Sequence, residues 1–426
     1  MTTHFIAIRI NLLGENLKRN YQIVFSIILP IILLILGLIR INSFVIEQFP
    51  KEKEFLPTWS SLRTYLDYGI DPYDENATNR TELLYYKQLV NDDRDPLILD
   101  QPLNSTLFFI PLAIINDYSI ARIVYLLGLE FFLIIIPLSF VYIQGWKPGW
   151  LVLAIFILLA FISPFQIQAL FTHDPAIFTI GLILLGLLSL KYKLDEFAGA
   201  LISLTIYQPS LSGILIIFLI LWVLRSKRWR ILWGFLLTMS LLTAISVVLI
   251  PDWIISFVKA FRIESEYKYY LSSQVVLSEL IPGVTNKITI FLTGIFSLVL
   301  LYEWIVMKKG DYRWLIWTIS LTISVYPFLG IPFQDDYSIM FFIPFAYLFI
   351  EISNKFKGKS KELIQLMILA IFFLSSWGFY LYFNNQQTQG PMNLGLFVII
   401  PLILTSGLYW MRWWVVKYSN LQVEML

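Results

Sequence analysis

The chain has 426 residues, of which 58% are hydrophobic and 14% charged, and its mean hydropathy is +0.72. A soluble domain carries about a quarter charged residues, so this composition excludes an ordinary soluble protein and predicts one built for the lipid bilayer. The absence of cysteine, with only two histidines (His4 and His173), excludes disulfides, thiolate catalysis and histidine-rich metal sites. We predict no metal site, no cofactor and no nucleic-acid partner, and leave dependence on a divalent metal open. The net charge of +2 is uninformative, because the distribution of the charges matters more than their sum.

Apolar segments alternate with basic clusters along the whole chain. The first apolar run, 21–41, is long enough to cross the bilayer and lacks a following A-x-A cleavage signal, so we interpret it as a retained signal anchor. By the positive-inside rule the basic clusters face the cytoplasm, which places both termini inside. These clusters lie at Lys18-Arg19, Lys147, Lys191 with Lys193, Arg225 to Arg230, Lys308 to Arg313, Lys355 to Lys361, and Arg412 with Lys417.

The apolar segments predict an all-α polytopic membrane protein with about 11–13 transmembrane helices, which we treat as a single domain, 1–426. The apolar stretch 105–116 is too short to span and suits an interfacial or re-entrant piece. The pair 196–207 and 210–224 suits a shallow hairpin that turns at Gln208-Pro209. The predicted spans are 22–41, 119–143, 149–163, 174–190, 196–207, 210–224, 230–250, 286–307, 313–330, 337–353, 362–383 and 392–416.

Two long external loops follow from this topology, at 42–104 and 251–285. Most acidic residues fall on the external side, although the basic clusters alone determined the topology. Acidic residues contribute little to orientation, so their excess needs another reason. A site made of carboxylates at the outer face supplies one, because carboxylates held just above the bilayer can reach a lipid-borne substrate.

Glu54 in the first loop is a candidate general base, since a positioned carboxylate can take the proton of an attacking hydroxyl. The alternative is that 51–54 (Lys-Glu-Lys-Glu) is a solvated run of charges outside a membrane helix. The sequence Gly-Ile-Asp-Pro-Tyr-Asp at 69–74 is a turn, because glycine permits positive φ and proline restricts the residue before it. Asp71 and Tyr73 in this turn are candidate substrate ligands, against the alternative of a plain surface turn.

Two further external segments carry polar residues at the ends of predicted spans. Asp174 before Pro175 suits a helix N-cap, which explains the segment structurally, and a substrate contact from His173 is the alternative. Asp335 and Asp336 lie at the external end of a later span, where they can cap the next helix or bind sugar hydroxyls.

The second external loop places cations among tyrosines. Arg262 and Lys268 suit a lipid phosphate, and they equally suit anchoring at the membrane surface. Glu130 falls near the middle of span 119–143, where an acidic side chain is costly and usually functional or paired. Arg122 lies two helical turns earlier, too far for a direct i, i+4 pair.

The order and spacing of several motifs resemble glycosyltransferase family 87, integral membrane enzymes of the C superfamily. The long first external loop holds an acidic-Phe-x-x-x-Trp motif that begins at Glu54, followed by the Gly-x-Asp-Pro-Tyr turn. Glu54 stands where family members often have aspartate, and Gln208 follows Tyr207 where the family has a lysine in a Lys-Pro-Gln turn. Later matching segments are the Gln101 to Leu112 stretch, Ser273-Gln274-Val275-Val276-Leu277, and Asp335-Asp336-Tyr337.

This resemblance implies a hexosyl- or pentosyltransferase of a prokaryotic cell membrane that uses a polyprenyl-phosphate sugar as donor and a lipid or glycan as acceptor. It implies inversion at the anomeric carbon in one displacement, with Glu54 as base. Gln208 and Gln274 are then further candidate substrate ligands, and another cation must replace the absent lysine near the donor phosphate.

Two other classes of function fit a polytopic chain. A transporter or lipid flippase would place ionisable residues near the midplane in repeated halves, whereas here the charges collect at the outer face and Glu130 is nearly alone. An envelope-polymer ligase also acts on lipid-linked sugars, but its main loop usually comes late in the chain, and the early loop disfavours it.

Overall fold

The structure is a computed structural model, and it describes residues 28–50, 52–87, 96–267, 272–280, 286–307, 311–331, 335–356, 358, 360–384 and 393–423. The regular elements in these ranges are all helices, which confirms the predicted all-α class. The helix Ile28–Gln48 comes first. It is followed by α2 (Phe55–Tyr68), α3 (Glu75–Tyr86), α4 (Leu103–Thr106), η1 (Leu107–Phe109), α5 (Ile110–Ala113), α6 (Tyr118–Gln144), α7 (Trp150–Ile162), α8 (Pro164–Thr172), α9 (Ala176–Lys191), α10 (Asp195–Leu204), η2 (Thr205–Tyr207), α11 (Pro209–Ser226), α12 (Trp229–Leu249), α13 (Trp253–Tyr267), α14 (Ser273–Leu280), α15 (Asn286–Val306), α16 (Tyr312–Val325), η3 (Tyr326–Leu329), η4 (Asp335–Phe341), α17 (Phe342–Ser353), α18 (Lys361–Asn384), η5 (Gly395–Ile399, a π-helical turn) and α20 (Ile400–Val423).

Every predicted span corresponds to a helix or a helix pair, but fewer helices than predicted are long enough to cross a bilayer. Six helices in the described ranges pass by length and composition, or seven if the bent pair α7 and α8, with 49° between its halves, is one span. Several of the other predicted spans correspond to shorter apolar helices such as α9. The predicted number of 11–13 therefore includes helices that are shorter than a full span. The predicted break at Gln208-Pro209 is confirmed, because Pro209 begins α11.

The first external loop begins later than predicted and is itself folded. The first helix continues to Gln48 instead of ending at 41. Two helices follow: α2 ends at Gly69, whose φ of 69° is accessible to glycine at little cost, and Asp74 caps α3 by accepting a hydrogen bond from Asn76 N at 2.8 Å. The stretch predicted to be re-entrant, 105–116, is divided between α4, η1 and α5.

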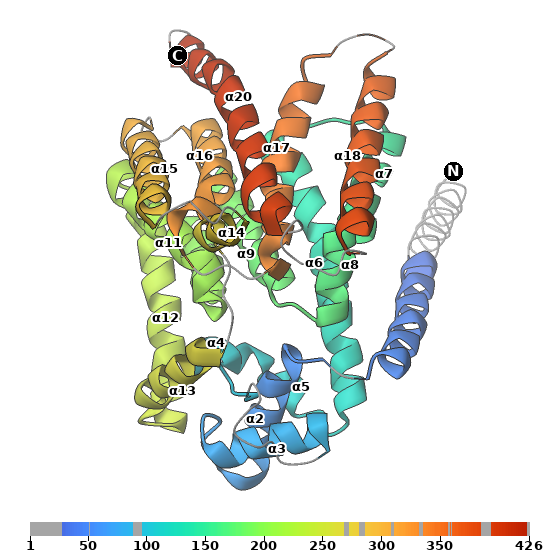
Figure 1. Cartoon of the computed structure of the whole chain (residues 1–426), viewed down its shortest axis with the longest axis vertical. Coiled ribbons are helices and arrows are strands. Elements are labelled where there is room, and N and C mark those ends of the chain that lie inside the picture. The colour runs from blue at the N-terminus through green and yellow to red at the C-terminus, as the bar shows by residue number, and fades with distance from the viewer. Residues whose placement is uncertain are drawn as a thin grey trace, which may run out of the picture.

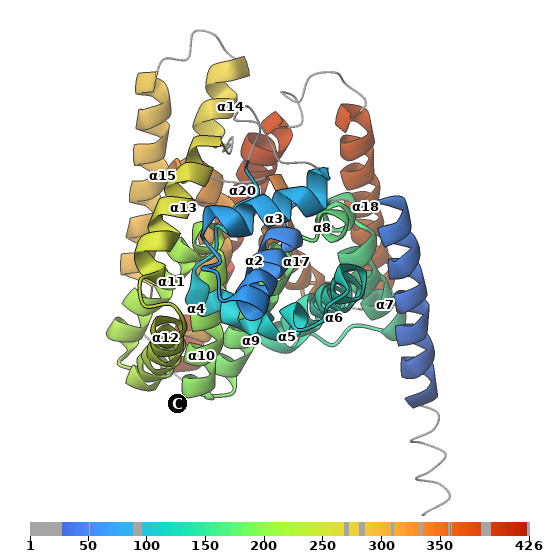
Figure 2. The same ribbon diagram turned by 90° about the horizontal axis from the view of Figure 1, so that it is seen from below.

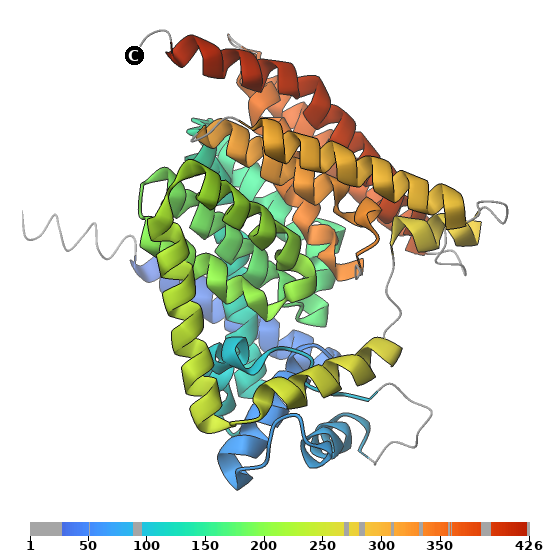
Figure 3. The same cartoon turned by 90° about the vertical axis from the view of Figure 1, so that its left-hand side faces the viewer.

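Helices from the two loops that the sequence predicts to be external gather at one end of the molecule. Figure 1 shows α2, α3 and α13 at the bottom, opposite the C-terminal end of α20, and Figure 2 shows these helices from below. In Figure 3, α12 runs down one side of the molecule and leads into α13. Hydrogen bonds join these segments: Tyr65 donates to Leu249 O at 3.2 Å, and Ser256 donates to Asp71 Oδ2 at 2.9 Å. The first predicted loop and α13 of the second therefore form one cap, whereas α14 of the second loop packs against α15 and η3.

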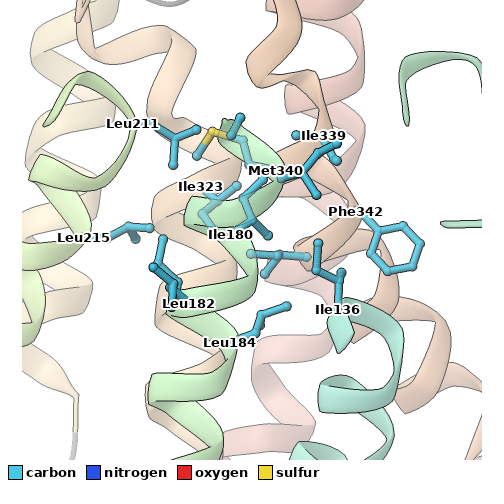
Figure 4. Packing of buried hydrophobic residues seen from close by; sticks show 14 of the residues in the cluster. Ile136, Ile180, Leu182, Leu184, Leu211, Leu215, Ile323, Ile339, Met340 and Phe342 are labelled. Atoms are coloured by element: carbon cyan, nitrogen blue, oxygen red, sulfur yellow. The ribbon is translucent and has the colours of Figure 1, made fainter. Parts of the chain in front are cut away.

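The centre of the bundle is α9, which is buried along nearly its whole length. This helix is apolar on all sides, as expected of a helix surrounded by protein. Figure 4 shows Ile180, Leu182 and Leu184 of α9 among side chains from α6, α11, α16, η4 and α17. Because both of its ends are held by this packing, α9 gives a fixed position to the residues that precede it, His173 to Pro175.

Glu130 of α6 has a partner that its own helix could not supply. Its side chain is 6% exposed, and Oε2 accepts a hydrogen bond from Asn42 Nδ2 at 3.2 Å. Asn42 lies on the first helix, whose apolar window is only 6% buried in the protein. Together with the buried side chain of Ile46, this polar contact joins the largely exposed first helix to the bundle.

Candidate functional site

A buried polar cluster lies where the cap meets the bundle. It contains Glu52, which precedes α2; Tyr118 and Arg122, from the first two turns of α6; and His173, between α8 and α9. Asp117 positions the start of α6 by accepting hydrogen bonds from Ser119 N at 2.7 Å and Ile120 N at 3.2 Å. Three segments distant in sequence are thereby brought to one place.

Glu52 is buried, with 5% of its surface exposed, which contradicts the alternative that 51–54 is wholly a solvated charge run. Its Oε2 accepts hydrogen bonds from Glu54 N at 2.9 Å and Phe55 N at 2.8 Å, so this carboxyl group caps α2. Its Oε1 accepts a hydrogen bond from the Tyr118 hydroxyl. Burial raises the pKa of Glu52 from 4.5 to about 7, outweighing the backbone hydrogen bonds and the positive charge of Arg122, both of which lower it.

His173 is held as a neutral ring. Arg122 donates from Nε to His173 Nε2 at 2.8 Å, and because a guanidinium group can only donate, Nε2 must be unprotonated. His173 Nδ1 then donates to Phe171 O at 2.9 Å. Burial, and next the charge of Arg122, lower the pKa of His173 from 6.5 to about 3. Its backbone is left-handed with φ of 61°, because His173 is the residue that ends α8.

Next to His173, Asp174 caps the central helix as the sequence predicted. Its Oδ1 accepts a hydrogen bond from Ala176 N at 2.8 Å and a longer one from Gln208 Nε2 at 3.4 Å. Gln208 also accepts from Thr179 Oγ1 at 3.0 Å. The candidate ligand Gln208 therefore lies beside Asp174, with 7% of its surface exposed.

A second chain of hydrogen bonds connects the cap to this region. Tyr73 donates to Gln101 O at 2.6 Å, Thr58 donates to Gln101 Oε1 at 3.1 Å, and the hydroxyls of Thr58 and Tyr207 are 3.3 Å apart. The Tyr73 N–H bonds Asp71 Oδ1 at 3.0 Å. Asp71 thus fixes the turn and, through Ser256, holds α13 against the cap.

Glu54 is partly exposed at the N-terminus of α2, immediately beside the buried cluster. Its charge acts on the hydroxyls of Tyr125 and Tyr207, two residues of the buried region. Glu52 and Glu54 therefore have different environments: the first is buried and caps α2, and the second is partly exposed at the start of the same helix. The burial of Glu52 could not be predicted from the sequence, because nothing next to it in the run of charges distinguishes it from an exposed acidic residue.

The other candidate residues lie elsewhere or outside the described residues. Gln274 on α14 donates to Phe328 O at 3.0 Å, a packing contact with η3. Arg262 is exposed on α13. Lys268 lies outside the described residues, as do the side chains of Asp335 and Asp336, although their backbone begins η4, which packs against α8 and α9. Within the described residues, no group of three or more potential metal-binding side chains occurs.

An apolar cavity of about 790 Å³ adjoins the polar cluster. It lies between α4 to α6 on one side and α9, α10 and α12 on the other. Tyr125 connects the two features, because it lines the cavity and its ring stacks on that of His173 at 6.5 Å between centroids, as well as on Phe55 at 4.2 Å. Phe108, Val124 and Ile245 in the cavity wall are 53%, 43% and 42% exposed, so the cavity opens to the side of the bundle.

Comparison with known families decides the class of the protein. The model of glycosyltransferase family 87 matches residues 102–334, just over half of the chain. The chain belongs to glycosyltransferase family 87. It is a multi-pass membrane glycosyltransferase, with a sugar donor and an acceptor as its substrates. No curated protein and no solved structure matches the chain.

The family match covers part of the candidate site. His173, Gln208 and Gln274 lie inside the matched range, as do Arg122 and Tyr125. The first external loop with Glu52, Glu54 and Asp71 precedes the range. This part of the cap is therefore assigned to the site of this family 87 protein by its contact with α6, because the family match does not cover it.

The raised pKa of Glu52 gives a testable dependence of stability on pH. In the folded protein, this carboxyl group keeps its proton between pH 4.5 and about 7, where the unfolded chain loses it, so the free energy of unfolding should fall as pH rises through that window. Glu52→Gln removes this contribution. We expect the thermal midpoint of this variant, measured in detergent, to increase relative to that of the wild type as the pH rises from about 5 to about 8.

Glu75→Gln, which removes an exposed acidic side chain at the start of α3, controls for the lost charge. A difference between Glu52→Gln and the wild type that does not change with pH would contradict the raised pKa.

Proposed function

We propose that this family 87 enzyme transfers a sugar from a polyprenyl-phosphate donor to a hydroxyl group of a lipid or glycan acceptor, at the outer face of a prokaryotic cell membrane. The observation that carries the proposal is the laterally open apolar cavity of about 790 Å³ beside a buried polar cluster. A soluble nucleotide sugar has no apolar chain to place there. A polyprenyl donor has one, with its phosphate–sugar group at the polar end.

In the proposed reaction, an acceptor oxygen attacks the anomeric carbon and the bond from that carbon to the phosphate oxygen breaks. Glu54 takes the acceptor proton, because it is the partly exposed carboxylate beside the cluster. The bonding electrons leave with the phosphate, so the products are a glycosylated acceptor and a polyprenyl phosphate. The resemblance of the first-loop motif to the family supports Glu54 as base and inversion of the anomeric carbon.

The proposal is tested by incubating purified, reconstituted protein with polyprenyl-phosphate sugars. We expect release of polyprenyl phosphate only when an acceptor is present, together with glycosylated acceptor. Movement of intact donor between leaflets without cleavage would instead favour the flippase alternative. Cleavage of a nucleotide sugar in place of the lipid donor would reject the proposed donor class.

The orientation of the protein in the membrane is tested separately. Because the chain has no cysteine, a single introduced cysteine is the only thiol that a maleimide can label. Asn76→Cys in the external cap and Lys227→Cys in a basic cluster both place the new thiol at exposed positions. With the termini cytoplasmic, a membrane-impermeant maleimide should label Asn76→Cys in intact cells and Lys227→Cys only after permeabilisation. The reverse pattern would place the site at the inner face.

A further inference from the structure

Arg122 is the most unusual charged residue in the bundle. Its side chain is 1% exposed, yet Nη1 and Nη2 have no hydrogen-bond partner in the part of the chain that the structure describes. Only Nε is engaged, with the neutral ring of His173. A guanidinium group stays charged and carries five donors, and leaving such a buried charge uncompensated is strongly destabilising. This arrangement points to an anionic ligand.

The groups around Arg122 do not supply the missing negative charge. Glu52 is the acidic residue whose charge acts on it, but no carboxylate among the described residues lies within the 4.0 Å that defines an ion pair with Arg122. Both oxygens of Glu52 already accept hydrogen bonds from the start of α2 and from Tyr118. Its pKa of about 7 leaves it only partly ionised near neutral pH. His173 contributes no charge.

The helix α6 places Arg122 in line with the cavity. Tyr125, Leu129 and Phe132 line the cavity, and they follow Arg122 at intervals of three, seven and ten residues, which is one face of a helix. At 1.5 Å per residue, Phe132 is about 15 Å farther along α6 from Arg122. A ligand with a charged group at Arg122 can therefore extend an apolar chain beside these three side chains.

We infer that Arg122 binds the phosphate group of the lipid donor, with both Nη atoms on its oxygens, while the polyprenyl chain lies in the cavity. This inference rests on the proposed function and replaces Arg262 and Lys268 as the cation at the phosphate. Fixed positive charge there stabilises the phosphate as it leaves and needs no proton transfer.

Access to Arg122 requires a ring to move. Tyr125 lies between the site and the cavity, since it stacks on Phe55 and, at 6.5 Å between ring centroids, on His173. Because Phe55 belongs to α2, the motion of Tyr125 couples phosphate entry to the external cap that carries Glu54.

The test measures lipid binding without the transfer reaction. The probes are a polyprenyl phosphate, the polyprenol of the same chain length, and inorganic phosphate, each titrated into purified protein. We expect the wild type to bind the phosphate lipid at least about tenfold more tightly than the polyprenol, as charge-assisted hydrogen bonds predict. Arg122→Gln should bind both lipids equally, with unchanged affinity for polyprenol, and Arg122→Lys should keep part of the preference.

Arg230→Gln, which removes an exposed arginine in a basic cluster, should keep the full preference. Unchanged binding of polyprenol shows that the cavity of a variant is intact, and Arg122→Lys serves if the glutamine variant does not fold. A phosphate preference that survives in Arg122→Gln overturns the inference. A wild type that binds neither lipid rejects the polyprenyl donor itself, and binding of inorganic phosphate alone keeps the anion site while rejecting its lipid source.

Discussion

Replacing Glu54 by glutamine should lower turnover by about 10²-fold or more while the donor still binds. The amide keeps the shape of the side chain at the N-terminus of α2 but cannot take the acceptor proton. Loss of a general base acts on the transition state, so kcat and kcat/KM should fall together. Steady-state rates of polyprenyl phosphate release, measured with purified protein at saturating donor, give this result directly.

Two variants make the experiment specific. Glu54→Asp keeps a carboxylate and has the side chain that the family motif often has there, so it should retain more activity than Glu54→Gln. Glu75→Gln removes an exposed acidic side chain from the same cap and should leave turnover near that of the wild type. Near-normal turnover of Glu54→Gln would show that another group is the base, and Asp67 and Asp71 in the same loop would be tested next.

Filling the cavity should weaken donor binding strongly. Gly128 of α6 lines the cavity, and a Cβ atom added there would meet no atom within 4 Å. Gly128→Leu should fit without strain and should also favour the helix by about 1 kcal/mol, since glycine is a poor helix former. The leucine side chain would occupy part of the cavity in which we propose that the polyprenyl chain lies. We expect KM for the lipid donor to rise roughly tenfold or more, because part of the buried contact area is lost.

Gly37→Leu is the matched control, because Gly37 also has no atom within 4 Å of an added Cβ and lies on the first helix, away from the cavity. Gly128→Ala, which adds one methyl group, should raise KM less than Gly128→Leu. If KM of Gly128→Leu stays at the wild-type value, the lipid chain does not use this cavity.

Most of the architecture could be predicted from the sequence, because apolar segments and basic clusters are local signals. The spans, the break before Pro209 and the Asp174 cap all follow from residues that are neighbours in sequence. The number of crossings could not be predicted in this way. A short helix such as α9 is as apolar as a membrane span, and only the packing around it shows that its apolar surface faces protein.

The centre of the site was harder to predict, because its partners are far apart in sequence. Arg122 and His173 are separated by 51 residues, and Glu52 and Tyr118 by 66. Nothing next to Glu52 distinguishes it from Glu54, and only the position of α6 buries the first and leaves the second partly exposed. His173 and Gln208 were found because turn and capping motifs drew attention to their segments.

The contact between Asn42 and Glu130 bears on the order in which the helices enter the membrane. The first helix enters the membrane well before α6, which carries an acidic side chain that is costly in hydrocarbon without a partner. Asn42 is already in the bilayer when α6 arrives, 88 residues later in the chain. We therefore expect the first helix to assist the insertion of α6 into the membrane. A chain that begins after this helix should insert α6 poorly, and the missing helix, produced as a separate peptide, should restore insertion.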